Sequence, residues 1–265
     1  MPELPDLEVY SENLTKTCKG KTVDTVRIHK EGWHKGAGAK LEETLPGEKL
    51  QVVEREGKEL RFRFSGGHVM GLHLMLKGRI AYYNPKKPAK PNIAEIMFTD
   101  NTGLLVSDFL GAANVSYNPE TSKVPDALSE DFDVDYFKPV LQKEKKTPIK
   151  SVLLDQKIVR GIGNAYADEI LYDCGISPFA QSAAIPDAKI KELIKSSKNV
   201  LKDAIKQIKK ADPDIIAGEV RDFLLVHIPK KTETEKGEKI LVKEINKRKS
   251  YYTESQEMYP NDLFS

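Results

Sequence analysis

The stretch LDQKIVRGIGNAYADE (residues 154–169) decides the fold of the second half of this chain. A first helical pattern begins at Thr147-Pro148 and is interrupted by Gly161-Ile162-Gly163-Asn164. A second pattern continues from Asn164 to Cys174 and ends at Gly175. Glycines let a backbone approach another surface closely, and the amide groups at a helix start bind phosphate. The break therefore predicts either a phosphate-binding turn or an ordinary helix–turn–helix corner with a capping glycine.

The rest of the second half fits a helical domain with a terminal hairpin. Residues 187–210 predict a long amphipathic helix, because isoleucines and leucines recur on one side of it and lysines lie on the opposite side. Residues 239–252 alternate as a β-hairpin around Asn246-Lys247-Arg248. Residues 118–137 are acidic and contain two prolines, a composition typical of an inter-domain linker.

The first half predicts a different architecture. Within residues 22–115, apolar and charged residues alternate along 58–64, and Ser65-Gly66-Gly67 then turns the chain. We expect further strands at 68–79, 95–99 and 103–107, and a loop rich in proline and lysine at 85–91. The prediction is an α+β chain of two domains. Residues 1–117 form an antiparallel β-sandwich with a flanking helix, 118–137 the linker, and 138–265 a helical domain.

The N-terminal sequence Pro2-Glu3-Leu4-Pro5 has two compatible interpretations. Pro5 suits the start of a helix, which apolar residues continue until Gly20. Methionine is normally removed before proline, and that step leaves a secondary amine next to a carboxylic acid. An α-amino group titrates at ~7.7–8.0 and a lysine at ~10.4, so the terminal amine is the better nucleophile at neutral pH. A helix that begins at Pro5 aims its positive end at this amine and lowers its pKa further.

Composition limits the classes of protein that this chain can represent. Its 265 residues contain only Cys18 and Cys174, which excludes a four-cysteine zinc site. Residues 1–136 carry 18 Lys/Arg against 21 Asp/Glu, and residues 137–265 carry 24 against 19, so a polyanion would bind mostly the second half. No stretch reads as a membrane helix or a signal peptide, and we expect an intracellular protein.

Several motifs occur in a fixed order along nearly the whole chain. They are Pro2-Glu3-Leu4-Pro5, Gly57-Lys58, His73-Leu74 and the 154–169 stretch, with the acidic linker at 128–133. Together they resemble the Fpg/Nei family (formamidopyrimidine-DNA glycosylase / endonuclease VIII), which cleaves damaged DNA and binds it with a helix–two-turn–helix (H2TH) element. The resemblance implies a base-excision-repair DNA glycosylase and AP lyase, without a cofactor, that acts as a monomer on double-stranded DNA with oxidised bases or abasic sites.

The resemblance also implies the catalytic residues. Pro2 is expected to attack C1′ of the damaged nucleoside and form a Schiff base, and elimination then nicks the strand. Glu3 supplies the proton that opens the sugar ring. Lys58 holds a phosphate near the lesion. In a strand over 58–64, Lys58 would lie on the same face as the apolar residues, where burial of a lysine costs free energy and indicates a special role. The alternative is that Lys58 precedes the strand and is solvated.

The implied DNA contacts lie in both domains. His73, Lys150, Gly163, Asn164 and Arg248 are expected to contact the DNA backbone, and Leu76 to fill the gap left by a flipped base. Without the resemblance, His73 reads as a strand histidine and Arg248 as an exposed turn residue.

Five departures from the family pattern bear on specificity. Thr253 and Gln256 stand where relatives have finger cysteines, so we expect a zincless finger at about 228–256 with no metal. Leu76 replaces a methionine, and Asp6 stands where many relatives have glutamate. The second wedge loop, 107–111, is shortened. The segment 221–227 leaves no room for a loop that caps 8-oxoguanine, which predicts weak excision of that base and weak discrimination of the opposite base.

Two other functions remain open from the sequence. The first is a non-catalytic or AP-lyase-only DNA-damage binding protein on the same scaffold. The second, which leaves residues 1–117 unexplained, is an RNA-binding module of ribosomal type. The expected location is intracellular, cytoplasmic and nucleoid-associated in a bacterium, with no contact to a membrane.

Overall fold

The computed structural model describes residues 1–30, 36–84 and 92–260, so the predicted loop at 85–91 lies outside the described residues. The chain divides into two compact units. Unit 1 comprises Met1–Thr121 and Ile208–Val220, and unit 2 comprises Ser122–Gln207 and Arg221–Ser265. Within the described ranges, no helix is long and apolar enough to cross a membrane.

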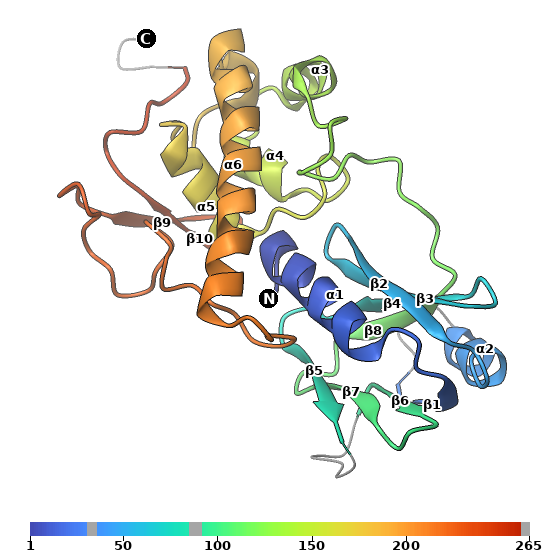
Figure 1. Ribbon diagram of the computed structural model, residues 1–265. Helices are drawn as coiled ribbons and strands as arrows, with labels where there is room; N and C mark the ends of the chain where they lie inside the picture. The colour runs from blue at the N-terminus through green and yellow to red at the C-terminus, as the bar shows by residue number, and fades with distance from the viewer. Residues whose placement is uncertain (31–35, 85–91, 261–265) are drawn as a thin grey trace. The chain divides into compact units, whose positions relative to one another are not determined.

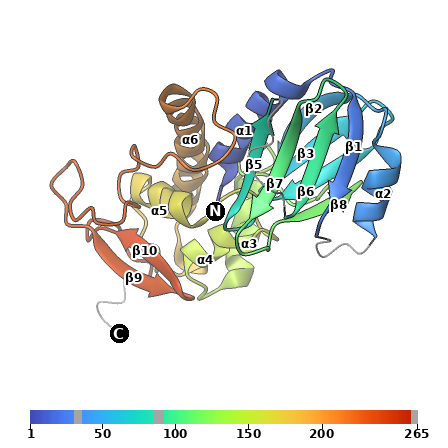
Figure 2. The same cartoon turned by 90° about the horizontal axis from the view of Figure 1, so that it is seen from below.

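Unit 1 contains two four-stranded antiparallel sheets that lie face to face (Figure 2). The first has the order β1 (Val23–Ile28), β6 (Ala94–Phe98), β7 (Gly103–Asp108), β5 (Gly78–Tyr83). The second has the order β2 (Leu50–Glu56), β3 (Glu59–Phe64), β4 (Val69–His73), β8 (Asn114–Tyr117). This arrangement confirms the predicted antiparallel sandwich.

The β2–β3 hairpin shows why the alternating pattern forms a strand. Leu60, Phe62 and Phe64 are at most 1% exposed and fill the core. Glu56 pairs with Glu59, so Gly57 and Lys58 form the two-residue turn between the strands, and Gly57 takes a positive φ of 60°. Lys58 is therefore half-buried in a turn, and the face parity used in the sequence argument does not apply to it.

The predicted single strand at 68–79 is wrong, because the chain breaks between β4 and β5. Met75 has a φ of 52°, and the Gly78 N–H donates to Leu74 O over 2.8 Å. A Cβ on Gly78 would lie 2.3 Å from Leu74 O, so the turn requires glycine there. β4 and β5 consequently belong to different sheets, and Leu76 lies on the turn that joins them.

Two helices accompany the sandwich. α1 (Leu4–Cys18) confirms the predicted N-terminal helix, with Glu3 as N-cap and a reciprocal capping box between Glu3 and Asp6. The buried face of α1 packs on β2 and β3. α2 (Ala37–Thr44) packs on β1 and β8 and was not expected within the β-rich stretch.

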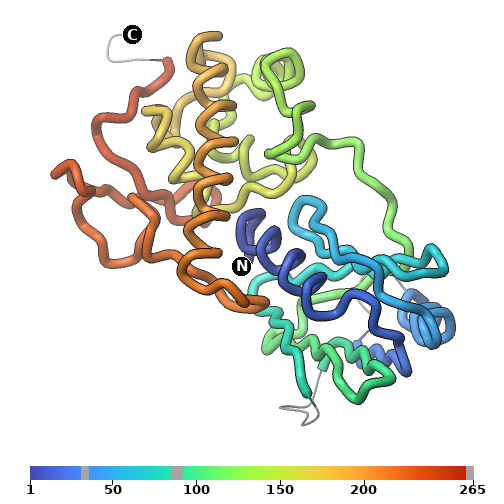
Figure 3. The backbone as a smooth tube through the Cα atoms, in the orientation of Figure 1, coloured from blue at the N-terminus to red at the C-terminus, as the bar shows by residue number. Residues whose placement is uncertain are grey.

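The segment Ile208–Val220 belongs to unit 1, although the sequence analysis assigned it to the domain 138–265. Lys209 pairs with Glu12 at 2.7 Å, and Asn13 Nδ2 donates to Ile215 O over 2.9 Å. The Tyr10 hydroxyl donates to Gly218 O. These contacts hold the segment along α1, as the tube in Figure 3 shows. Long-range contacts of this kind leave no local sequence pattern.

Unit 2 is helical apart from its finger hairpin (Figure 1). Its elements are α3 (Val134–Glu144), α4 (Ile149–Leu154), α5 (Asn164–Asp173), the 3₁₀ helix η1 (Ser182–Ala184), α6 (Asp187–Ala211), β9 (Leu241–Ile245) and β10 (Arg248–Tyr252). The last turn of α6, from Ile208, groups with unit 1. The predicted helices at 164–174 and 187–210 and the terminal hairpin are confirmed. The helix predicted from Thr147-Pro148 to the break at Gly161 is shorter than expected, because α4 ends at Leu154. α3 was missed: it begins inside the stretch interpreted as linker, where Asp133 Oδ1 caps it by accepting from the Tyr136 N–H.

Candidate functional site

The proposed nucleophile and acid lie together at the start of α1. Pro2 is buried and Glu3 is 4% exposed. The Glu3 carboxylate accepts from the Asp6 N–H, and the Glu3 N–H donates to Asp6 Oδ2 over 2.8 Å. The reciprocal bonds fix the Glu3 side chain at the positive end of the helix, directly beside the Pro2 nitrogen in the chain.

Arg55 joins α1 to the turn that carries Lys58. Its Nε donates to Glu8 Oε2 over 2.6 Å, and its Nη1 donates to Gly57 O over 3.1 Å. The Arg55 side chain is 8% exposed, so this link lies in a region of low dielectric where hydrogen bonds to charged groups are strong. The β2–β3 turn is thereby held against the helix that positions Pro2 and Glu3.

His73 lies at the end of β4 and interacts electrostatically with Lys58. Burial, and secondly the positive charge of Lys58, lower the pKa of His73 below its usual 6.5. Its Nδ1 accepts from the Met75 N–H over 3.1 Å. His73 is thus neutral at physiological pH and carries its proton on Nε2, which makes it a hydrogen-bond donor.

Two loops at one end of the sandwich present large apolar side chains. His73 pairs with Asn114, and Gly78 pairs with Asp108, so the β4–β5 turn and the β7–β8 loop leave the sheets side by side. Leu76 on the first is 57% exposed; Phe109 and Leu110 on the second are 94% and 53% exposed. The sequence analysis found no match for a wedge on the second loop and missed Phe109 and Leu110. The signal was two large apolar residues between a strand and Gly111.

The β7–β8 loop is held in shape by Asp108. This 1% exposed carboxylate accepts from the backbone N–H groups of Leu110, Ala112 and Ala113 over 2.9, 2.7 and 2.7 Å. These bonds order the backbone of the loop, from which the Phe109 side chain extends into solvent. Exposed aromatic residues on an ordered loop are typical of a binding surface.

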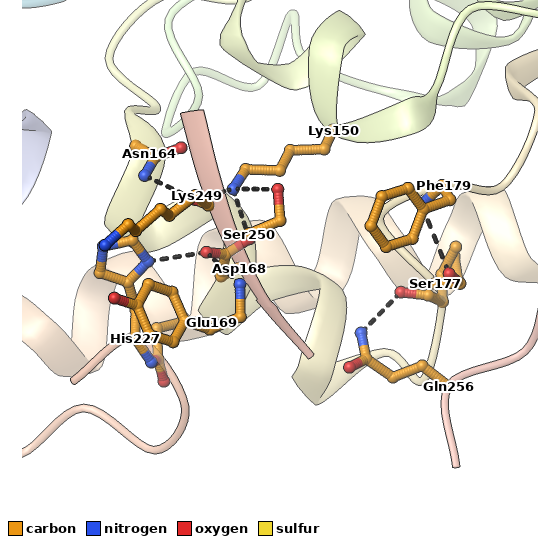
Figure 4. A network of polar contacts seen from close by, with 12 residues as sticks. Lys150, Asn164, Asp168, Glu169, Ser177, Phe179, His227, Lys249, Ser250 and Gln256 are labelled. Carbon is orange, nitrogen blue, oxygen red and sulfur yellow. Dashed lines mark hydrogen bonds and ion pairs between the residues drawn. The ribbon is translucent and has the colours of Figure 1, made fainter. Parts of the chain in front are cut away.

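Lys150 lies in the interior of unit 2, which argues against its predicted phosphate contact. Its side chain is 0% exposed, and its Nζ lies 2.7 Å from Asp168 Oδ1. The same ammonium donates to Ser250 Oγ over 2.9 Å and to Lys249 O over 3.0 Å (Figure 4). Asp168 Oδ2 in turn accepts from the Tyr251 N–H and bonds His227 Nδ1. Lys150 therefore joins α4 and α5 to β10, and a phosphate would have to displace these partners.

Asn164 ties the turn between the two helices to the finger hairpin β9–β10. Gly163 is the N-cap of α5 in an extended conformation, and Asn164 is the first helical residue. Asn164 Nδ2 donates to Lys249 O over 3.0 Å, the same carbonyl that accepts from Lys150 (Figure 4). The turn predicted to bind phosphate and the hairpin that carries Arg248 thus share one anchor, the Lys249 carbonyl group.

Arg248 is exposed at the start of β10, directly after the turn Asn246-Lys247, whose φ angles are 49° and 63°. A cavity of about 270 Å³ lies between this hairpin tip and the end of α4. Its lining residues are Ser151, Leu154, Asp155, Ile245, Asn246 and Arg248. Asn246 Nδ2 donates to Ser151 Oγ over 3.1 Å and fixes the tip against α4.

Gln256 occupies the base of the finger, where the sequence lacks a cysteine. Its Oε1 accepts from the Thr253 N–H and its Nε2 donates to Ile176 O, each over 2.8 Å. Gln256 is 7% exposed and Thr253 is 1% exposed. Within the part of the chain that the structure describes, no three His, Cys, Asp or Glu residues gather to hold a metal ion. The amide supplies local cross-links at this position.

Glu169 holds the short segment after Arg221. Its two carboxylate oxygens accept from the N–H groups of Leu225, Val226 and His227 over 2.8, 2.9 and 2.7 Å. Burial raises the pKa of Glu169, and the three N–H donors oppose that rise. The segment 221–227 is consequently tethered to α5.

Comparison with known proteins agrees with this geometry. Residues 1–114 match the family described as formamidopyrimidine-DNA glycosylase N-terminal domain, and residues 124–213 match the formamidopyrimidine-DNA glycosylase H2TH domain. The formamidopyrimidine-DNA glycosylase of Lactobacillus johnsonii is 32% identical over 217 residues, which cover 78% of each chain. That of Bacillus subtilis is 33% identical over 217 residues, with 77% of this chain and 78% of its own covered.

Solved structures share the fold. A Lactococcus lactis Fpg in complex with abasic-site DNA superposes with a TM-score of 0.84 at 23% identity, and covers 97% of this chain and all of its own. MutM in complex with DNA containing carbocyclic 8-oxoguanine gives a TM-score of 0.82 at 24% identity, with 95% and 98% covered. Taken with the sequence relatives, these matches show that the chain belongs to the formamidopyrimidine-DNA glycosylase family.

Proposed function

We propose that this chain is a bifunctional DNA glycosylase and AP lyase of base-excision repair whose nucleophile is Pro2, exposed by removal of Met1. Family membership supports the reaction class. The observation that carries the residue assignment is the capping box, which holds the Glu3 carboxylate at the start of α1 beside the Pro2 nitrogen.

At the sugar, the chemistry uses the Pro2 nitrogen and the Glu3 carboxyl group. The Pro2 nitrogen forms a bond to C1′, and the damaged base leaves with the electron pair of the glycosidic bond and takes up a proton. The nitrogen loses its proton, the C1′–O4′ bond breaks, and O4′ receives a proton from Glu3, which leaves an iminium. The Glu3 carboxylate then takes up a 2′ proton, and the electron pair released expels the 3′ phosphate, which nicks the strand.

Lys58 and His73 are proposed to hold the DNA backbone near this centre. Lys58 supplies a positive charge on a turn braced by Arg55. Neutral His73 supplies an Nε2–H donor, since Nδ1 is occupied by the Met75 N–H. A neutral donor beside a lysine avoids repulsion between two cations while both bind one polyanion.

In unit 2, Gly163, Asn164 and Arg248 are proposed to contact phosphates. The anchoring of Asn164 and of the finger hairpin to Lys249 O and Lys150 supports a rigid, preorganised surface. Lys150 is proposed as the support of that surface rather than as a phosphate ligand.

Lesion preference is proposed from two features. Leu76, Phe109 and Leu110 form an apolar wedge that fills the gap of a flipped base but has no side-chain donor with which to read the opposite base. The segment 221–227, tethered by Glu169, is too short to cap 8-oxoguanine. Oxidised pyrimidines, formamidopyrimidines, hydantoins and abasic sites are therefore the proposed substrates, and 8-oxoguanine a weak one.

The partner is double-stranded DNA with these lesions, bound by a monomer. Because the substrate is the cell's own DNA, we also propose an intracellular location, in the cytoplasm and on the nucleoid in a bacterium.

Borohydride trapping tests the function against a non-catalytic binder. Reduction during reaction with an abasic duplex is expected to link the wild-type chain covalently to DNA, and Pro2→Gly or an uncleaved Met1 to impair that link. A panel of duplexes with single lesions then ranks substrates. Binding without any trapped or nicked product supports the binder, and strong, cytosine-dependent release of 8-oxoguanine contradicts the lesion preference.

A further inference from the structure

The α-amino group of Met1 lies 2.6 Å from Glu219 Oε1, within unit 1. The segment Ile208–Val220 brings Glu219 there from far along the sequence. The contacts of Asn13 with Ile215 O and of Tyr10 with Gly218 O guide this segment along α1 towards its N-terminal end. Hydrogen bonds between this segment and α1 therefore place Glu219 beside the chain terminus.

The surroundings distinguish this pair from a fully solvated one. The side chains of Met1 and Glu219 are 29% and 34% exposed. By contrast, Asp214 of the same segment pairs with Lys16 of α1 at 3.3 Å, and the side chains of Lys16 and Asp214 are 75% and 81% exposed. A partly shielded charge pair interacts more strongly than an exposed pair. Two other carboxylates, Glu3 and Asp6, lie at this end of α1, and each accepts the other's backbone N–H.

We propose that Glu219 is the counter-ion of the nucleophile: it holds the Pro2 nitrogen by a hydrogen bond and balances the positive charge of the iminium. This inference rests on the proposed function. Bond lengths place the Pro2 nitrogen within about 4 Å of the Met1 nitrogen, so after removal of Met1 the new amine lies within about 7 Å of Glu219 Oε1, a gap that rotation of the Glu219 side chain closes. The iminium carries a full positive charge that the uncharged, attacking amine lacks, so the carboxylate stabilises the covalent intermediate relative to that amine.

The proposal predicts a separation of rate from binding. In Glu219→Gln, single-turnover trapping on an abasic duplex should slow about tenfold, the loss of one partly shielded charge pair. The Kd for DNA should stay equal or fall, because a negative charge near a polyanion is removed. Glu219→Asp should recover most of the rate.

The pH profile gives a readout that a structural role would not move. A nearby carboxylate favours the protonated amine, which cannot attack. The acidic limb of the trapping rate should therefore move to lower pH in Glu219→Gln, with Glu3 and Asp6 unchanged in both proteins. Asp214→Asn is the matched control: it removes the same charge from the same segment at an exposed pair and should leave rate and profile at wild-type values.

The outcomes separate the two proposals. If wild-type protein is trapped but Glu219→Gln and Asp214→Asn match it in rate and pH profile, the counter-ion inference is overturned and the proposed function stands. If Glu219→Gln and Glu219→Asp lose rate and DNA affinity together, Glu219 is structural and the inference is again overturned. Absence of trapping in the wild type overturns both.

Discussion

Lys150 Nζ lies 2.7 Å from Asp168 Oδ1, and solvent reaches neither side chain. Because Asp168 also bonds His227 and the Tyr251 N–H, this one carboxylate joins α4, α5 and the finger hairpin. Removal of one partner from such a pair leaves a buried charge. The stability of unit 2 should therefore depend on Lys150 far more than on its exposed lysines.

Lys150→Met tests that dependence. The substitution keeps the length of the side chain and removes the charge, and the free energy of unfolding should fall by about 3–5 kcal/mol, measured by urea titration. Lys138→Met is the control, since Lys138 pairs at 2.6 Å with Asp187 and the two side chains are 45% and 61% exposed. Equal losses in the two variants would show that the buried network contributes nothing special.

The hydrogen bonds of Gln256 should stabilise the base of the finger, at a position where relatives have a metal-binding cysteine. Gln256→Ala breaks the bonds to the Thr253 N–H and Ile176 O. Two buried partners left unsatisfied should cost about 1–3 kcal/mol each, seen in thermal unfolding, and DNA affinity should drop as Arg248 loses its support. Gln142→Ala, which removes an exposed bond to Ala183 O, is the control. Chelators should leave wild-type DNA binding unchanged; a chelator-sensitive finger would refute this role.

The proximity of Lys58 and His73 predicts a coupled titration. NMR should give His73 a pKa below 6.5, and Lys58→Met should raise it towards that value, since one of the two causes of the depression is lost. Lys49→Met, an exposed lysine elsewhere in unit 1, should not change it. A His73 pKa that ignores Lys58 would separate the two residues.

The same depression has a consequence for stability. The unfolded chain binds the His73 proton more readily than the folded one, so this residue lowers stability as pH falls through about 6.5 towards its folded pKa. In His73→Gln, the free energy of unfolding should depend less on pH within that window, and its pH dependence above about 6.5 should be that of the wild type.

Phe109 should matter to the reaction and little to the fold. At 94% exposure, its replacement by alanine should change stability by no more than about 0.5 kcal/mol. Excision from duplex DNA should nevertheless slow about tenfold, because a wedge residue offsets the few kcal/mol of unstacking. Met258→Ala, another exposed apolar residue, is the control. Unchanged excision by Phe109→Ala would remove the second loop from the site.

Local signals in the sequence were enough for many elements of the fold. Pro5 and the apolar spacing gave α1, the alternation of 58–64 gave β3, and Asn246-Lys247 gave the hairpin turn, because each depends on nearby residues. The break at Met75 was missed, although Gly78, which the turn requires, was a local signal for it. α3 was hidden by the acidic, proline-containing composition around it.

The residues whose roles depend on distant contacts were not predictable. Burial of Lys150 becomes evident only when Asp168 and Ser250 close around it, whereas the family resemblance implied a contact with phosphate. Glu219 gives no local signal, since Met1 lies 218 residues away in sequence. Phe109 was overlooked because its loop was compared with longer ones.

The most direct test of the central claim is mass spectrometry of the N-terminal peptide after borohydride trapping on an abasic duplex. The account predicts a chain without Met1 whose Pro2 nitrogen carries the reduced deoxyribose fragment. An adduct on another residue, or a fully active chain that still has Met1 ahead of Pro2, would contradict it.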